Sequence, residues 1–140
     1  MAINRDTLVF SMGGTHQLWA LNLKTNRAFV FAGCGKEGNL NAKQVLKDCE
    51  WAQPNGLTVG LISQNHIELF VADSESSSVR SVNMKTLTST RGVVGGDANP
   101  KNLHSFGDRD GIGFEAKLQH PLGIHFIPEK NVILVADTFN

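Results

Sequence analysis

The chain has 140 residues, of which 41% are hydrophobic and 19% charged, a composition typical of one globular domain or of part of one. Thirteen Lys and Arg residues balance thirteen Asp and Glu residues, so no net positive charge favours a nucleic acid as partner. No apolar run reaches the roughly 18 residues of a membrane span, and residues 1–7 lack the apolar core of a secretion signal, so we expect neither a membrane protein nor a secreted one.

Short stretches rich in β-branched, aromatic and other apolar residues follow one another along the chain, separated by turn residues. Several short strands with turns between them predict an all-β antiparallel architecture. One segment, 41–51, favours a short helix, with Asn41 as its N-cap and Val45, Leu46 and Cys49 on one side. The predicted strands cover residues 8–10, 17–23, 28–32, 56–62, 67–72, 79–84, 92–94, 122–127 and 132–136.

The sequence repeats three short motifs in a constant order. A Pro-Gly motif, a Val-Ala-Asp motif and an Asn-x-Lys-Thr motif recur at separations of 61 to 67 residues. Near-constant separations over three motifs indicate one structural unit that is used more than once. The paired copies are 54–57 with 121–124, 71–74 with 135–138, and 22–25 with 83–86.

Each repeat unit is predicted to hold four strands, which in the middle copy fall at about 56–62, 67–73, 78–84 and 87–94. A recurring four-stranded unit is typical of a β-propeller blade, whose faces are buried against neighbouring blades. We therefore predict a partial β-propeller of about two and a quarter blades out of roughly six, entered at the second strand of its first blade. The predicted organisation is a partial blade at 7–33, a full blade at 54–96 and a partial blade at 120–140, with long junction loops at 35–53 and 97–119 as candidate contact surfaces.

The Val-Ala-Asp motif places an acidic residue at the end of a predicted second strand. Asp73 and Asp137 are expected to accept hydrogen bonds from backbone N–H groups of the turn that follows, which is a structural role. A ligand role would require several such carboxylates to converge near a central channel. The first copy carries Met12 at this position, which argues against a ring of equivalent acids.

Three other patterns resemble functional motifs without the context that those motifs need. Residues 33–38 spell Gly-x-Gly-x-x-Gly, but the parallel βαβ unit of a dinucleotide site is missing, and the repeat aligns Gly33 with Gly95 at the close of a blade. Residues 108–111 resemble the start of a calcium loop but lack its third acidic ligand and its terminal Glu, so we expect a polar turn. The histidines show no metal-ligand spacing; they are His16, His66, His104, His120 and His125.

The two cysteines, Cys34 and Cys49, form neither a Cys-x-x-Cys motif nor a zinc-site pattern. We therefore expect two reduced thiols in an intracellular protein. Because no catalytic or metal-binding grouping emerges from the motifs, we assign no catalytic, cofactor-binding or metal-binding residue and expect no cofactor.

The motifs resemble NHL repeats, a family of β-propeller repeats whose pattern runs Pro-x-Gly, a spacer and Val-Ala-Asp-Ser/Thr. The resemblance rests on residues 71–76 and 120–124, and longer stretches at 14–21, 52–57, 70–77 and 116–123 extend it over about residues 8–140. It implies a cytosolic multidomain protein in which a thioredoxin-like domain precedes the propeller and a β-rich segment follows it. No residue of this chain matches the thioredoxin-type cysteine motif, so redox activity is not carried over.

The expected function is that of a non-catalytic protein-interaction platform within such a larger cytoplasmic protein. Its expected contacts are an unidentified protein partner and the remaining blades of the propeller. Two alternatives stay open. One is a metal-dependent propeller enzyme of lactonase or lyase type, which needs His, Asp, Asn or Glu ligands near the propeller axis. The other is an RNA-binding NHL propeller, which needs a basic surface, whereas the basic residues here are scattered.

Overall fold

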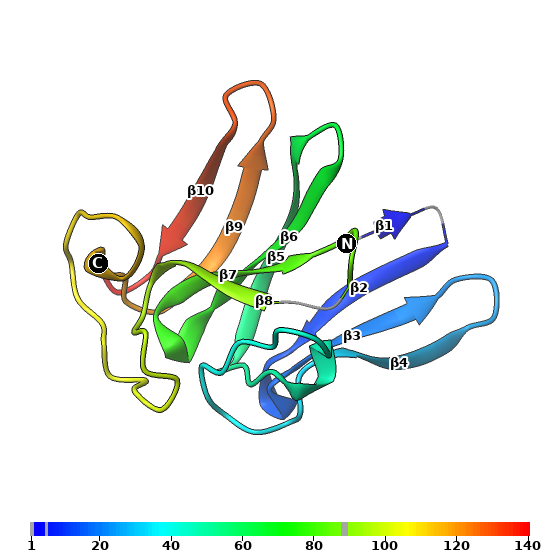
Figure 1. The fold of residues 1–140 in the computed structure, drawn as a ribbon, viewed down its shortest axis with the longest axis horizontal. Coiled ribbons are helices and arrows are strands. Elements are labelled where there is room, and N and C mark those ends of the chain that lie inside the picture. Colours follow the sequence, from blue (N-terminus) through cyan, green and yellow to red (C-terminus); the bar gives the residue numbers. More distant parts are fainter. Residues whose placement is uncertain (1, 5, 88–89) are drawn as a thin grey trace.

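The computed structural model describes residues 2–4, 6–87 and 90–140. Its strands form two four-stranded antiparallel sheets and one hairpin, which fan out side by side in chain order (Figure 1). Within each sheet the strand order is the chain order. The strands are β1 Ala2–Asn4, β2 Thr7–Met12, β3 Gln17–Asn22 and β4 Arg27–Ala32 in the first sheet; β5 Pro54–Ser63, β6 His66–Asp73, β7 Ser78–Asn83 and β8 Thr90–Gly95 in the middle sheet; and β9 Pro121–Ile127 with β10 Val132–Asp137 in the hairpin.

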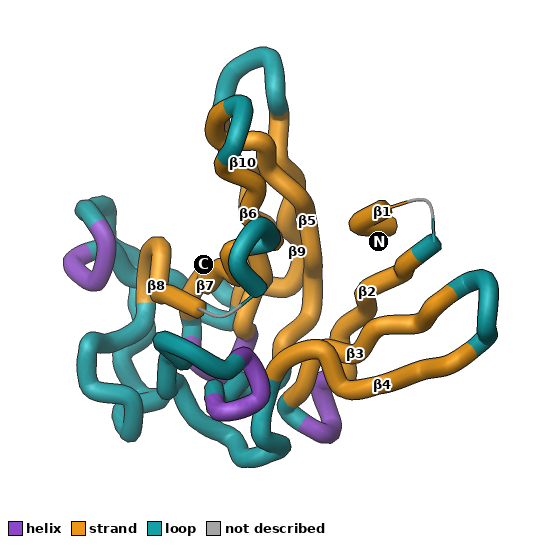
Figure 2. The backbone as a smooth tube through the Cα atoms, turned by 45° about the vertical axis from the view of Figure 1, so that its right-hand side comes forward, coloured by secondary structure: helices purple, strands orange, loops and turns teal. Residues whose placement is uncertain are grey.

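Helical structure in the described part of the chain is confined to four single turns of 3-10 helix (Figure 2). These turns are η1 Gly13–Thr15, η2 Leu46–Asp48, η3 Ser74–Ser76 and η4 Gly113–Glu115. None of the described helices is long and apolar enough to cross a membrane. The antiparallel sheets confirm the predicted all-β architecture. It forms because each unit contains short runs that can pair locally across tight turns.

The predicted helix over 41–51 is wrong. Only the single turn Leu46–Asp48 is helical, and Val45 before it is extended, with φ −131° and ψ 115°. The backbone of this segment makes hydrogen bonds outside a helix. Ala42 exchanges hydrogen bonds with Thr90 of β8, and the Glu50 N–H donates to the Leu40 carbonyl at 3.0 Å. Tertiary hydrogen bonds outweigh a weak local helix preference here.

The first sheet contains one strand more than the sequence suggested. We expected the chain to enter at the second strand of a blade, but the short strand β1 pairs with β2, with Ala2 opposite Leu8 and Asn4 opposite Thr7. The fourth strand of the middle unit, predicted at about 87–94, is observed as Thr90–Gly95. Residues 88–89 of that prediction lie outside the described residues.

The main hydrophobic core lies between the first sheet and the middle sheet. Side chains of both sheets and of the loop 35–53 are fully buried in it, so the loop is part of the core rather than a cover over it. A second apolar contact joins the middle sheet to the hairpin, where the rings of Phe70 and Phe126 stack with their centres 6.4 Å apart. The main core contains Val9, Leu18, Ala20, Leu69, Val71, Val82, Leu46, Cys49 and Trp51.

The turns of successive sheets repeat the same geometry. Asn22 Oδ1 accepts hydrogen bonds from the N–H groups two and three residues further on, both at 3.0 Å, and Asn83 Oδ1 does the same at the same distances. His16 and Ser77 each follow a 3-10 turn with a left-handed backbone, at φ 53° and 49°. The Asn-x-Lys-Thr motif is therefore an Asx turn that ends the third strand of each sheet.

One end of the molecule holds all the long connections. Because the strands are antiparallel, the turns η1 and η3 and the loops 35–53 and 97–119 lie at the same end of their sheets; in Figure 1 the loop 35–53 is at the bottom and the loop 97–119 at the left. The short hairpin turns after β5 and β9 point the opposite way. Any surface built from long loops is consequently restricted to this end.

Candidate functional site

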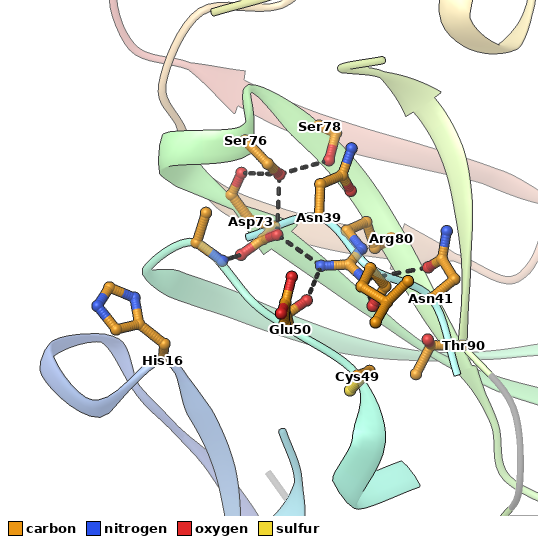
Figure 3. A network of polar contacts seen from close by, with 12 residues as sticks. His16, Asn39, Asn41, Cys49, Glu50, Asp73, Ser76, Ser78, Arg80 and Thr90 are labelled. Carbon is orange, nitrogen blue, oxygen red and sulfur yellow. Dashed lines mark hydrogen bonds and ion pairs between the residues drawn. The ribbon is translucent and has the colours of Figure 1, made fainter. Parts of the chain in front are cut away.

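A buried network of charged and polar groups occupies the end of β6 and the start of β7. The Arg80 Nη1 donates to Asp73 Oδ2 at 3.0 Å, and neither side chain has any exposed surface (Figure 3). Asp73 also accepts hydrogen bonds from the Ser76 hydroxyl at 2.8 Å and from the Ala52 N–H at 2.9 Å. The carboxylate therefore joins the turn after β6 to the residue that leads into β5.

Arg80 connects the middle sheet to the loop 35–53. Its guanidinium donates to the carbonyls of Glu50 at 2.5 Å and Leu40 at 3.0 Å and to Asn41 Oδ1 at 3.0 Å. Its carbon Cζ lies 4.4 Å from the centre of the Trp51 ring, a cation–π contact. The guanidinium thus holds both ends of the segment 40–50 against the middle sheet.

Burial dominates the electrostatics of this network. Desolvation raises the pKa of Asp73 above its usual range, against the opposing effects of Arg80, the Ser76 hydroxyl and the Ala52 N–H. Desolvation likewise raises the pKa of the Cys49 thiol to about 11, and this thiol donates to the Leu46 carbonyl at 3.0 Å. Groups so enclosed cannot reach a substrate, so this network acts on the fold.

The Asp residues of the Val-Ala-Asp motif play the same part in two units. Asp137 accepts from the Gln119 N–H at 2.7 Å and from the Asn140 Nδ2 at 2.5 Å, matching the contacts of Asp73 with Ala52 and Ser76. The backbone donor in each case precedes the first strand of the unit, whereas we expected donors in the following turn. Each carboxylate therefore binds the backbone just before the first strand of its own unit, β5 for Asp73 and β9 for Asp137.

In the first sheet, uncharged residues occupy the positions of both charged residues of the network. Met12 and Trp19 take the positions of Asp73 and Arg80, because Met12 faces Gln17 as Asp73 faces Ser78. Trp19 Nε1 donates to Gln17 Oε1 at 3.0 Å instead. Sequence reasoning did not single out Arg80, although this paired change between the two units was a signal that could have found it.

The Gly-x-Gly-x-x-Gly segment closes the first sheet. Gly33 has φ 106°, and a Cβ there would come within 2.8 Å of both the His16 carbonyl and the Trp51 ring. Gly95, at φ 75°, lies in the same way against the Ser77 carbonyl and Leu118. These glycines let the end of the fourth strand pass close to the neighbouring backbone, and the segment forms a junction between blades.

The calcium-like segment 108–111 is a turn held by its own loop. Arg109 exchanges backbone hydrogen bonds with Lys117, and its Nε donates to the Glu115 carbonyl at 2.7 Å. Asp108 and Asp110 are exposed on either side of it. Within residues 2–4, 6–87 and 90–140, no group of three or more His, Cys, Asp or Glu side chains is placed to hold a metal ion.

The histidines are dispersed over the molecule. The Gln53 N–H donates to His16 Nδ1 at 3.3 Å, and His120 Nε2 lies 2.9 Å from Glu75 Oε1. Both pairs join the turn of one unit to the residue before the first strand of the next. His66 Nε2 lies 2.7 Å from Glu68 on β6. His104 and His125 are not part of these pairs.

Glu68 forms a separate ionic cluster on β6. Its side chain is only 4% exposed, and Arg91 of β8 reaches both of its oxygens, at 3.0 and 3.3 Å. Burial opposes ionisation, but the neighbouring Ser81 hydroxyl and the hydrogen bonds from Arg91 and His66 outweigh it and lower the pKa of Glu68. The cluster connects β6 to β8 across the middle sheet.

The two junction loops differ in exposure. Loop 35–53 places Ala42, Leu46, Cys49 and Trp51 in the core, so its inner face is already used. Loop 97–119 presents Phe106, Ile112 and Phe114 outward, with 53%, 86% and 42% of their surface exposed. A cavity of about 290 Å³ opens beside the second loop and is lined by Glu75, Ser77, Leu103, His104, Phe106, Gln119, His120 and Phe139.

Known proteins of similar sequence align with this chain over nearly its full length. No protein-family model matches it. NHL repeat-containing protein 2 of Homo sapiens is 44% identical over 147 residues, and that of Bos taurus is 42% identical over 151; these alignments cover 96% and 99% of this chain but 20% of each relative. Protein SUPPRESSOR OF QUENCHING 1, chloroplastic, of Arabidopsis thaliana is 37% identical over 136 residues, covering 96% of this chain and 12% of that protein.

Solved structures with little sequence identity share the fold. An auxiliary nutrient binding protein from Bacteroides thetaiotaomicron superimposes with a TM-score of 0.75 at 18% identity, and one from Bacteroides ovatus with 0.76 at 14% identity. Each superposition covers 94% of this chain and 32% of the neighbour.

Successive antiparallel sheets built from one repeated unit, and joined by equivalent junction contacts, define a partial β-propeller of the repeat-protein class. The chain spans about a fifth of the length of the mammalian relatives that it matches. At 42–44% identity over almost all of its residues, it is a homologue of NHL repeat-containing protein 2.

Proposed function

We propose that this chain is a non-catalytic propeller segment that binds a protein partner through the loop 97–119. The observation that carries the proposal is the outward placement of Phe106 and Ile112, which are 53% and 86% exposed. A surface loop that exposes several large apolar side chains is a candidate docking site for another protein. The names of the relatives describe a repeat-containing protein and state no reaction.

The loop is held in one shape by its own hydrogen bonds. Asp97 accepts from the Asn99 N–H and from Asn102 Nδ2, both at 2.8 Å, and these bonds hold the pKa of Asp97 below its usual range. Lys117 Nζ donates to the Gly96 carbonyl at 3.0 Å and to the Ser105 hydroxyl at 2.5 Å. A loop ordered before binding loses little conformational entropy when a partner docks.

A cytoplasmic setting forms part of the proposal. Both cysteines are free, Cys34 exposed and Cys49 buried, which suits a reducing compartment. Cell fractionation of the full-length protein tests this location, and recovery in a secreted or organelle fraction would contradict it.

Partner capture by the full-length protein tests the interaction role. We expect Phe106→Ser combined with Ile112→Ser to reduce recovery of the bound partners at least about tenfold, because exposed apolar anchors carry much of the energy of an interface. Leu61→Ser is the matched control, since Leu61 is 58% exposed and lies near the end of β5 that is remote from the long loops. Equal recovery by the loop variant and the control would refute the loop as the binding surface.

A further inference from the structure

The cavity beside the loop 97–119 is assembled at the junction between the middle sheet and the hairpin. Glu75 and Ser77 come from the turn after β6, and His120 and Phe139 from either end of the hairpin. The loop contributes Leu103, His104 and Phe106. Its volume of about 290 Å³ accommodates one large side chain rather than a drug-sized ligand. Three separate segments therefore contribute to a single small site.

Its charge is set by one carboxylate. Glu75 Oε1 lies 2.9 Å from His120 Nε2, and among the described residues Glu75 Oε2 has no hydrogen-bond partner. The described residues that line the cavity include neither Lys nor Arg. The site therefore offers an acceptor oxygen beside two imidazoles, His104 and His120, and without Lys or Arg, which favours a ligand that donates hydrogen bonds, such as a planar cation, over an anionic one.

Its walls are aromatic. The Phe139 ring meets the His120 ring edge to face at 4.9 Å between centres, and Phe139 and Phe106 remain 64% and 53% exposed. Phenyl faces attract cations, and a planar guanidinium can lie against a ring while it donates to a carboxylate. Aromatic walls with one free carboxylate oxygen match the chemistry of an arginine side chain.

The equivalent junction between the first and middle sheets lacks this chemistry. There Gly14 stands in the position of Glu75, Gln53 in that of His120, and Glu75 in that of Phe139. By contrast, the backbone conformation recurs, since Gln53 and His120 are both left-handed, at φ 56° and 58°. The fold therefore requires the backbone geometry at this position but does not require the acidic and aromatic side chains.

We propose that this cavity binds an arginine side chain of the protein partner, with Glu75 as the counter-ion and Phe106 and Phe139 as the flanking rings. The inference rests on the proposed interaction function and names the partner residue that the site recognises. A guanidinium placed there donates to Glu75 Oε2 without displacing His120 from Oε1.

Peptide binding to the full-length protein tests the inference. The probe is an acetylated, amidated Gly-Gly-Arg-Gly-Gly peptide, compared by titration with its citrulline counterpart, which keeps the shape but has no charge. We expect the arginine peptide to bind at least about tenfold more tightly, as a charge-assisted hydrogen bond requires. Glu75→Gln should remove this preference, and Glu129→Gln, in the distant hairpin turn, should preserve it.

Two outcomes separate this inference from the proposed function. Equal binding of both peptides, or an arginine preference that survives Glu75→Gln in a variant with an unchanged melting temperature, overturns the arginine site even if partner capture still depends on Phe106 and Ile112. Loss of the preference in Glu75→Gln together with capture that ignores Ile112 supports the arginine site and refutes the wider loop surface.

Discussion

At the scale of single residues, Arg80 links parts of the chain that are 30 to 40 residues apart in sequence. A buried ion pair adds little net stability compared with an apolar pair of the same shape, but removal of one partner leaves an uncompensated charge. In the first sheet the equivalent positions hold Met12, which is 37% exposed, and Trp19, whereas the middle sheet buries the ionic pair completely. The ionic pair also orients the guanidinium toward the carbonyls of the loop 35–53.

Loss of the charge on Asp73 should destabilise the protein strongly. Asp73→Asn keeps a similar shape but leaves Arg80 buried without its counter-ion, and we expect a cost of about 3–5 kcal/mol in the free energy of unfolding. Urea denaturation measures this cost. Glu129→Gln is the surface control, with an expected change within about 0.5 kcal/mol. A cost for Asp73→Asn no larger than that of the control would show that the pair has no structural role.

The two thiols should differ in reactivity. Cys34 is exposed, whereas Cys49 is buried and its pKa is raised to about 11. Since the thiolate is the reactive form, we expect a thiol reagent at pH 8 to modify one cysteine per native chain and two per denatured chain. Mass spectrometry locates the label. Native labelling of Cys49 as fast as that of Cys34 would contradict the burial.

The same thiol predicts a loss of stability in alkali. Below about pH 9 the thiol is protonated in both states, so its contribution is fully present; between pH 9 and pH 11 only the unfolded chain ionises, which favours unfolding. The loss should reach about 2 kcal/mol at pH 11, given about 1.4 kcal/mol for each pH unit and partial ionisation of the native thiol near pH 11. The fall in unfolding free energy over this range should be shallower for Cys49→Ala, and an identical slope would exclude this cause.

At the scale of elements, residues that act locally could be predicted and residues that act over distance could not. The strands and their Asx turns follow from short patterns such as the one at Asn83, whose partners lie two and three residues away. The segment 41–51 has a helical pattern, yet its backbone bonds to Thr90 of a strand far along the chain. The pairing of Asp73 with Arg80 and the cavity at Glu75 likewise depend on docking of loops, which no local pattern specifies.

The junction contacts offer a stabilising substitution. The Ser74 hydroxyl donates to the Pro121 carbonyl at 2.7 Å, and Gly13 holds the equivalent position against Pro54. A Cβ on Gly13 would lie 3.5 Å from the Pro54 carbonyl, an ordinary contact. Gly13→Ser should therefore add this hydrogen bond and raise the free energy of unfolding by about 0.5–1.5 kcal/mol.

Thermal and urea denaturation compare Gly13→Ser with Gly13→Ala and with Ser74→Ala. The alanine at position 13 controls for backbone entropy, and Ser74→Ala should destabilise by about 1 kcal/mol because the second junction loses its hydroxyl. If Gly13→Ser is no more stable than Gly13→Ala, the two junctions are not equivalent in the way that the repeat indicates.

At the scale of the whole molecule, the arrangement of the sheets determines how the 140-residue chain behaves in isolation. Among the described residues β10 pairs only with β9, and its side chains Val132 and Leu134 are 41% and 57% exposed. An open, apolar strand edge is a template for association. We therefore expect the isolated chain to self-associate, which size-exclusion chromatography with light scattering would detect, and Leu134→Lys to reduce this association because a charge on an edge strand opposes pairing. A monodisperse monomer with a cooperative melt would show instead that two sheets and a hairpin are sufficient for a stable fold.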